Sequence, residues 1–297
     1  MAGTDLSRVL VTGALGFVGG EMARALIADG RDVTLLVREG KQKEAEEKFV
    51  GFHETVTLQD LVEFPDARIF ETIFHLATVY SYENTIADIS KLVDSNITLP
   101  TTLADIASRW GTKVSFVNVS TFMQHFQGAS YSPTCLYAAT KKSIEDILDY
   151  YNSAFEGLNI AHIVFPHIYG EGDTRAKLLN LIINATKSKS SLSLASGRQL
   201  LDLVHVSDAV TALKHVESLG TGRWSIGSDV CYSIRELIEL VHEISQVRLE
   251  VNFDEVKDRR YDTFQIWDTA ERLPGWAEGT HLHEWITKQL VTLEEIR

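Results

Sequence analysis

The 297-residue chain is predicted to be an α/β protein with a doubly wound parallel sheet and a smaller C-terminal lobe for substrate binding. Three observations support this class. Short apolar runs alternate with helix-like stretches through the first half, as the strands and helices of a parallel sheet do. Glycines stand between the first run and the first helical stretch. Apolar residues make up 44% of the chain, which is enough for a full core.

The expected strands of the first half are short, buried and followed by turns or helices. They cover residues 8–11, 32–37, 56–58, 72–76 and 114–117. The first helix is expected to stop at Gly30. Two long helices follow, over 86–109 and 137–155. The second of them carries an apolar stripe at Ile144, Ile147, Leu148, Tyr151 and Phe155.

The alternation loosens after a strand over 160–165, which indicates a second, interleaved lobe. Ser233 and Glu236 have the spacing of a capping box, so a helix is expected over 234–245. The predicted division places residues 1–163 in the larger domain, joined by about 203–230, and residues 164–202 and 231–297 in the lobe.

Charge and composition exclude several classes of protein. A net charge of −13 argues against nucleic-acid binding, because phosphates require clustered Lys and Arg. No apolar stretch is long enough to span a membrane. The first strand begins by Arg8, which leaves no room for a signal peptide. Cys135 and Cys231 form neither a disulfide framework nor a metal-ligand pattern. We therefore expect a cytoplasmic protein.

The stretch VLVTGALGFVGG places Gly13, Gly16 and Gly19 between the first strand and the first helix. Glycine at these positions permits a tight turn, a close approach of the backbone to a pyrophosphate, and close helix packing. The helix that begins near Phe17 and Val18 offers free N–H groups to the anion. The pattern in this setting predicts a Rossmann dinucleotide site.

The end of the second strand bears on which nicotinamide cofactor fits. A carboxylate there would bind the ribose 2′-hydroxyl of NAD and repel a 2′-phosphate. This chain has Arg38 instead, with Lys41 close behind, so NADP(H) is favoured over NAD. Arg38 as a plain surface charge is the alternative. Asp60 after the third strand fits either a contact to the adenine amine or a helix cap.

Tyr137 and Lys141 stand four residues apart in YAATK, at the start of a long helix, and therefore share one face. A free tyrosine has a pKa of about 10. The neighbouring ammonium is expected to bring that pKa down toward the working range. Thr121, at the end of a strand, can bind the oxygen whose proton moves. Together these three residues indicate proton transfer to or from a carbinol oxygen.

These motifs resemble those of the extended short-chain dehydrogenase/reductases, the NAD-dependent epimerase/dehydratase family of nucleotide-sugar enzymes. The resemblance covers nearly the whole chain, through TGALGFVG, HLAT, DSNITLPTTL, STFMQHF, YAATK, HIYGEGD and LLDLVHVSDAV. It implies that Thr121, Tyr137 and Lys141 form the catalytic triad. It implies a cofactor site at Gly13, Gly16, Phe17, Val18, Arg38, Asp60, Leu76, Ala77, Tyr137, Lys141 and Pro166. It implies substrate contacts at Tyr80, Ser81, Asn96, Thr121, His167, Arg259 and Arg260.

The chain also departs from the family pattern. The sugar-nucleotide 4,6-dehydratases follow their Thr with an Asp-Glu pair, where this chain has Phe122 and Met123. Dehydration is therefore not expected. His167 replaces a common Asn, and Leu201 replaces a usual Arg, which leaves Asp202 alone. These changes affect the substrate contacts and leave the cofactor turn and the triad intact.

Among the branches, the chain looks most like the reductases that complete 3,6-dideoxyhexoses on a CDP carrier, the CDP-abequose and CDP-paratose synthases. The implied activity is NADPH-dependent reduction of the C4 ketone of a nucleotide-linked 4-keto-6-deoxyhexose or 3,6-dideoxyhexose, in the biosynthesis of lipopolysaccharide O-antigen sugars. The alternatives are an NDP-hexose 4-epimerase with tightly bound NAD and a non-catalytic NADP-binding redox sensor. The resemblance implies a homodimer through the helices at 86–109 and 137–155. No metal is expected, and His281 and His283 are read as a surface pair.

Overall fold

A computed structural model describes residues 8–81, 85–268 and 271–291. Its centre is a parallel sheet of seven strands in the order β11-β6-β5-β4-β1-β2-β3. The strands are β1 (Arg8–Thr12), β2 (Asp32–Leu36), β3 (Glu54–Val56), β4 (Thr72–His75), β5 (Val114–Thr121), β6 (Leu158–Phe165) and β11 (Gly222–Ser225). The chain runs outward from β1 in one direction and then, from β4, in the other. The predicted doubly wound α/β fold is confirmed.

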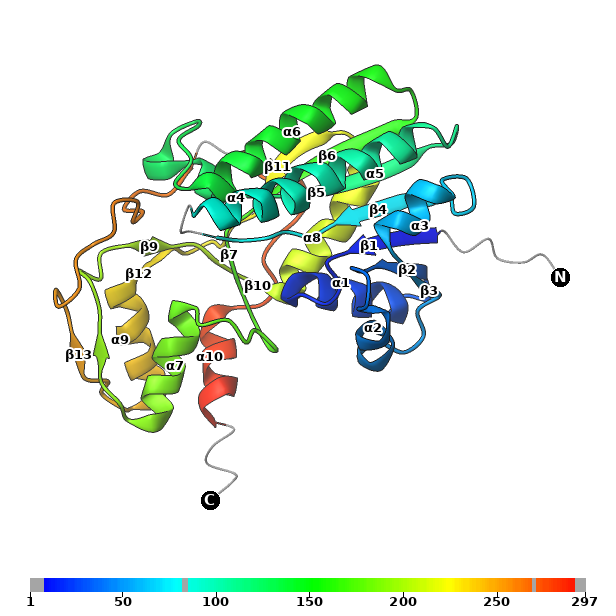
Figure 1. The fold of residues 1–297 in the computed structure, drawn as a ribbon. Coiled ribbons are helices and arrows are strands. Elements are labelled where there is room, and N and C mark those ends of the chain that lie inside the picture. The colour runs from blue at the N-terminus through cyan, green and yellow to red at the C-terminus, as the bar shows by residue number, and fades with distance from the viewer. Residues whose placement is uncertain (1–7, 82–84, 269–270, 292–297) are drawn as a thin grey trace.

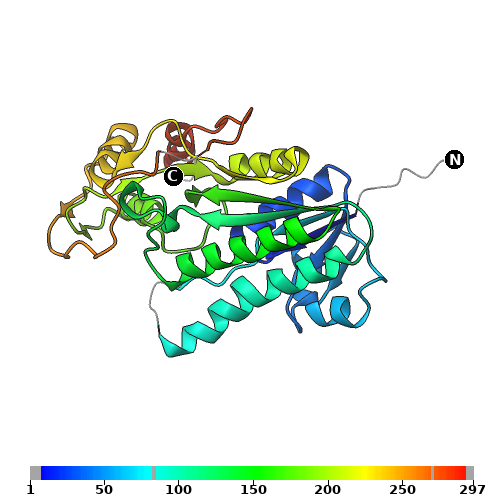
Figure 2. The same ribbon diagram turned by 90° about the horizontal axis from the view of Figure 1, so that it is seen from above.

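Helices cover both faces of this sheet (Figure 1). One face carries α4 (Ile86–Val93), the π-helical η1 (Asp94–Thr98), α5 (Leu99–Ser108) and α6 (Leu136–Ala154). The other carries α1 (Phe17–Ala28) and α8 (Val206–Leu219). Shorter helices α2 (Gln42–Lys48) and α3 (Leu58–Glu63) flank β2 and β3. From above, α6 runs beside the continuous segment of α4, η1 and α5 along one edge of the molecule (Figure 2).

The alternation of side chains along β1 shows why both faces need cover. Val9 and Val11 point into the apolar cluster that includes Met22 and Leu213, from the helices of one face. Leu10, between them, belongs to the opposite cluster with Ile144 of α6. Successive side chains of a strand point to opposite faces, so an uninterrupted apolar run requires a helix layer on each side.

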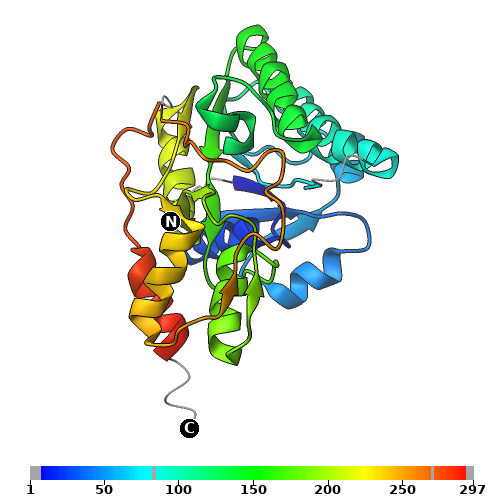
Figure 3. The ribbon, with the colours of Figure 1, turned by 90° about the vertical axis from the view of Figure 1, so that its left-hand side faces the viewer.

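The helices of the lobe gather at one end of the molecule (Figure 3). They pack around an apolar cluster of their own, which includes Ile182, Leu237 and Trp285. Its helices are α7 (Leu178–Ser188), α9 (Ile234–Ser245) and α10 (Leu282–Val291). Its short paired strands are β7 (His167–Tyr169) with β10 (Leu203–His205), β9 (Leu200–Leu201) with β12 (Tyr232–Ser233), and β8 (Leu192–Ser193) with β13 (Val251–Asn252). Two 3-10 turns, η2 (Phe122–Gln124) and η3 (Phe126–Gly128), follow β5. The capping box at Ser233 and Glu236 is present as predicted.

Two predicted elements differ from the structure. The strand expected over 56–58 ends at Val56, because Thr57 and Asp60 form a capping box that starts α3 at Leu58. The single helix expected over 86–109 is divided by η1, which widens the helix around the buried Asn96. Within the described ranges, no helix has both the length and the apolar character needed to cross a bilayer.

Candidate active site

The site lies where the parallel strands end. Beside β1 the direction of strand order reverses, with β2 on one side and β4 on the other. Loops that follow the carboxyl ends of strands diverge at such a point and leave a crevice for a ligand. Thr12, His75, Thr121 and Phe165 are the last residues of β1, β4, β5 and β6. The segments that follow these four residues therefore build the site.

The glycine turn after β1 is packed as a cofactor cradle requires. Gly13 has a φ of +73°, and a Cβ there would stand 2.7 Å from the backbone nitrogen of Ala77. A Cβ on Gly19 would stand 2.2 Å from the Gly13 oxygen. Thr12 Oγ1 accepts hydrogen bonds from the N–H groups of Leu76 at 3.1 Å and Ala77 at 2.9 Å. Any larger side chain at the two glycines would push the turn away from β4.

The first helix then presents its N-terminus beside this turn. Gly16 is the N-cap, and α1 begins at Phe17, so the first N–H groups of the helix face outward without a capping side chain. Val18 packs against the core and fixes the helix on the sheet. The Lys48 ammonium donates to the carbonyl of Leu15 at 3.0 Å and braces the turn from α2. Glycines, free N–H groups and a positive helix end fit the pyrophosphate of a dinucleotide.

The two candidate contacts to the adenosine half have different surroundings. Arg38 is exposed just beyond β2, where the sequence places a 2′-phosphate contact. Asp60 Oδ2 accepts from the Thr57 N–H at 2.7 Å, and the Thr57 hydroxyl accepts from the Asp60 N–H at 3.2 Å. These hydrogen bonds lower the pKa of Asp60. Of the two alternatives for Asp60, the helix cap is formed.

The structure brings the three predicted catalytic residues together. Thr121 is the last residue of β5 and is 6% exposed. The phenol hydroxyl of Tyr137, in the first turn of α6, hydrogen-bonds with Thr121 and with Thr78 after β4. Lys141 is buried one turn further along α6. A ligand oxygen that met both hydroxyls would receive a proton from one and orientation from the other.

The prediction that Lys141 lowers the pKa of Tyr137 is wrong for this structure. Burial raises the pKa of Tyr137 to about 12, although hydrogen bonds from Thr78 and Thr121 oppose the shift. Burial likewise lowers the pKa of Lys141 to about 8, and the Glu145 carboxylate opposes that shift. Low solvation favours the neutral form of each group. At neutral pH Tyr137 is therefore a phenol, the form that can donate a proton.

A cavity with a volume of about 30 Å³ opens beside Phe122, the residue that follows Thr121. The ring of Phe122 packs on His167 with centroids 4.5 Å apart, and both side chains line it. Burial and the nearby Lys177 and Arg175 lower the pKa of His167 to about 4, so its imidazole is neutral. Pro166, which was predicted to contact the cofactor, also lines the cavity. The cavity's other lining residues include His125, Val164, Leu200, Asp202, Ile226, Thr263, Ile266, Trp267 and Arg272.

Three residues predicted to contact substrate follow β4 or lie opposite it. The ring of Tyr80 lies 5.1 Å from that of Tyr137, edge to face, so Tyr80 borders the catalytic hydroxyl. Ser81 Oγ donates to Asp88 Oδ2 at 3.1 Å. Asn96 in η1 is fully buried. Its amide donates to the Val79 carbonyl at 2.9 Å and accepts from the Val79 N–H at 2.8 Å.

Asn96 also bonds to Thr78 Oγ1 at 3.0 Å and to Thr140 Oγ1 at 3.1 Å. These four contacts use its full hydrogen-bonding capacity. They tie the loop after β4 to the catalytic helix α6. We therefore assign Asn96 a positioning role, through Thr78, on the hydroxyl of Tyr137.

Two further predicted substrate contacts, Arg259 and Arg260, are not among the residues that line the cavity. Arg259 and Arg260 are exposed in the segment before Thr263, and the Arg260 guanidinium lies over the Tyr261 ring at 5.1 Å. The cavity is lined by Arg272 from further along the same segment. Sequence reasoning missed Arg272 and Trp267. An arginine and a tryptophan within the closing segment were the available signal, but strand and helix periodicity does not place a loop.

Comparisons with known proteins agree with this arrangement. The "NAD dependent epimerase/dehydratase family" matches residues 9–227. A CDP-abequose synthase from Salmonella muenchen is 22% identical over 290 residues, which span 95% of this chain and 97% of that protein. The structure of MoeE5 in complex with UDP-glucose and NAD superposes with a TM-score of 0.79, at 23% identity over 98% of this chain and all of that one.

The UDP-glucose 4-epimerase of Thermotoga maritima, solved with UDP-glucose, gives a TM-score of 0.80 at 19% identity, over 97% of this chain and 99% of that one. These likenesses confirm the fold. The family match begins at β1, includes the glycine turn and the Thr121–Tyr137–Lys141 group, and ends beyond β11. Because the family model covers residues 9–227, most of the chain, the protein belongs to the NAD-dependent epimerase/dehydratase family.

Proposed function

We propose that the protein is an NADPH-dependent reductase of the C4 ketone of a nucleotide-linked 4-keto-6-deoxyhexose or 3,6-dideoxyhexose, with CDP as the carrier. The observation that carries this proposal is Tyr137 hydrogen-bonded to Thr121, with Phe122 and Met123 directly after that threonine. These two positions supply no acid–base pair for removing water from a sugar, whereas reduction needs one proton and one hydride. Similarity to a CDP-abequose synthase along nearly the full chain supports the carrier.

The mechanism follows from the positions of the side chains. The dinucleotide, held at the glycine turn, would supply the hydride to the ketone carbon. Thr121 orients the carbonyl oxygen, and Tyr137 gives its phenolic proton to the oxygen as negative charge develops there. The Lys141 ammonium then stabilises the phenolate, which is otherwise disfavoured by burial. Arg38, exposed beyond β2, would pair with the 2′-phosphate.

A direct test is NADPH oxidation with a panel of CDP-, dTDP-, GDP- and UDP-linked 4-keto-6-deoxyhexoses, with NADH in parallel. We expect turnover of the CDP-linked sugar and a preference for NADPH. Tyr137→Phe should lower kcat by about 10²–10⁴-fold while the Kd for NADPH is unchanged. Full activity of that variant would refute the role of Tyr137.

Two other results would redirect the assignment. Purified protein that retains NAD and interconverts C4 epimers without net NADPH consumption would be an epimerase, since epimerases use the same three residues. Protein that binds NADPH but turns over no member of the panel would be a redox sensor. The choice between NADPH and NADH is tested separately with Arg38→Glu. This variant should weaken NADPH binding and leave NADH binding unchanged, whichever reaction the protein catalyses.

A further inference from the structure

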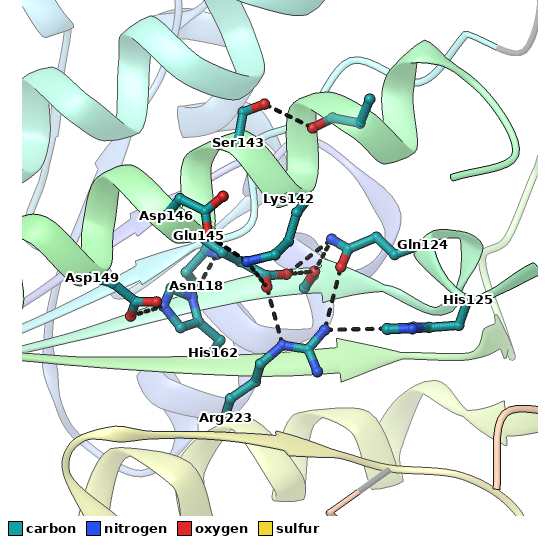
Figure 4. Close-up of polar contacts among 12 residues, drawn as sticks. Asn118, Gln124, His125, Lys142, Ser143, Glu145, Asp146, Asp149, His162 and Arg223 are labelled. Carbon is teal, nitrogen blue, oxygen red and sulfur yellow. Dashed lines mark hydrogen bonds and ion pairs between the residues drawn. The ribbon is translucent and has the colours of Figure 1, made fainter. Parts of the chain in front are cut away.

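A buried network of charged and polar side chains lies behind the end of β5, outside the residues that perform the reduction (Figure 4). Its centre is Glu145 on α6, which is 1% exposed. One carboxylate oxygen accepts from the Ser120 hydroxyl and from Gln124 Nε2 at 2.9 Å. The other accepts from Arg223 Nε, on β11, at 3.0 Å. The Arg223 side chain is 34% exposed, so it is the carboxylate whose removal from water costs free energy, and stability alone is a weak reason for its presence.

Arg223 carries the network into the wall of the substrate cavity. Its Nη2 lies 3.3 Å from Gln124 Oε1 and 3.2 Å from His125 Nε2. Because a guanidinium only donates, His125 Nε2 is the acceptor, and Nδ1–H donates to the Ala129 carbonyl at 3.1 Å. The His125 ring stacks on Trp267 with centroids 3.4 Å apart and planes at 9°. Both rings line the cavity.

The opposite end of the network reaches the catalytic group. Ser120 immediately precedes Thr121 on β5, so the carboxylate that binds Ser120 also fixes the strand end. Glu145 lies one helical turn beyond Lys141 on α6. At that separation side chains are neighbours on the helix surface. The same carboxylate therefore lies one helical turn from the lysine of the triad and pairs with the guanidinium that supports the cavity wall.

We propose that Glu145 is a positioning residue of the reduction. Its carboxylate holds Lys141 as an ammonium and, through Arg223, fixes the His125–Trp267 wall against which the sugar binds. The proposal rests on the proposed function, because it assigns roles within the same site. Burial lowers the pKa of Lys141, and Glu145 supplies the opposing negative charge.

The other ionisable groups around this pair do not replace Glu145. Asp149 pairs with His162 at 3.1 Å on the side away from Lys141. Lys142 reaches Glu145 at 3.9 Å but forms its closer ion pair with Asp146. The remaining groups that interact with Glu145 or Lys141 are neutral or cationic: His75 on β4, His125 after η2, His162 on β6 and Arg223 on β11. Tyr137, four residues before Lys141 on α6, is a neutral phenol.

The first experiment follows the ionisation of Lys141 without turnover. Lysine labelled with ¹³C at Cε is titrated by NMR, and the Lys141 signal is the one that disappears in Lys141→Met. We expect Glu145→Gln to lower its midpoint by about one unit. Asp146→Asn removes the same charge from the next residue, whose side chain is 64% exposed, and should leave the midpoint unchanged. An unshifted midpoint in Glu145→Gln would overturn the proposal.

The second experiment measures the reaction. In Glu145→Gln the alkaline limb of the kcat profile should move to lower pH with the Lys141 midpoint. The KM for the keto-sugar nucleotide should rise about tenfold or more, while the Kd for NADPH stays unchanged. Glu145→Asp keeps the charge and should restore the midpoint, which guards against a variant that only misfolds. A loss of thermal stability with unchanged midpoint and KM would reduce Glu145 to a structural role. Since the titration needs no substrate, it stands even where no keto-sugar is reduced.

Discussion

Lys141 shows the energetic cost of the site at the scale of one residue. It is 2% exposed, and burial lowers its pKa from 10.5 to about 8. A buried ammonium is disfavoured relative to a solvated one. Its charge is therefore maintained against the preference of the folded chain. Residues of this kind mark places where function outweighs stability.

Replacing that lysine should stabilise the protein while removing its activity. We expect Lys141→Met to raise the free energy of unfolding at neutral pH by about 3 kcal/mol. The wild-type penalty is fully present below about pH 8 and disappears as pH rises toward 10.5, so the difference should shrink in alkali. Urea denaturation of wild type and Lys141→Met, at neutral pH and again near pH 10.5, measures this difference in the free energy of unfolding. Lys142→Met, on the outer face of the helix, should change stability by less than about 0.5 kcal/mol.

At the scale of the element, the start of α3 bears on whether Asp60 is a helix cap or a contact to the adenine amine. Asp60 closes a capping box with Thr57, which accounts for its hydrogen bonds. We expect Asp60→Ala to cost about 1 kcal/mol of stability and to leave the Kd for NADPH unchanged. Thermal unfolding measures the change in stability, and a fluorescence titration measures the Kd for NADPH. A weakened Kd with unchanged stability would instead indicate contact with the adenine amine.

The surface of α4 and α6 raises a question at the scale of the whole molecule. Ile86 is 89% exposed and Tyr150 on α6 is 61% exposed, and these helices lie side by side along one edge. The homodimer implied by the family resemblance would cover them. We expect Ile86→Glu to convert a dimer to a monomer in light scattering. Val50→Glu, at a side chain equally exposed at 89% before β3, should leave the mass unchanged. A monomeric wild-type protein would contradict the expectation.

The sequence predicted those parts of the molecule that depend on local patterns. Apolar runs, the glycine turn and the spacing of Tyr137 and Lys141 each report on neighbouring residues, and the structure contains all of them. Glu145 was within reach, because it follows Lys141 by four residues on the same helix. Its partner Arg223 was not, because it lies 78 positions away on another strand. For the same reason the sequence did not identify Arg272 as a residue lining the cavity, since the closing segment has no periodicity that would locate it.

The size of the substrate cavity has a kinetic consequence. Its volume of about 30 Å³ holds about two water molecules, whereas sites for small organic ligands measure roughly 300–1,000 Å³. For the proposed reduction we therefore expect a hexose to enter only after the wall carrying Thr263 and Trp267 moves away from Phe122. The rate of substrate binding would then be limited by this motion of the protein rather than by diffusion. In stopped-flow measurements the observed binding rate should level off as the sugar nucleotide is increased, at the frequency with which the wall opens.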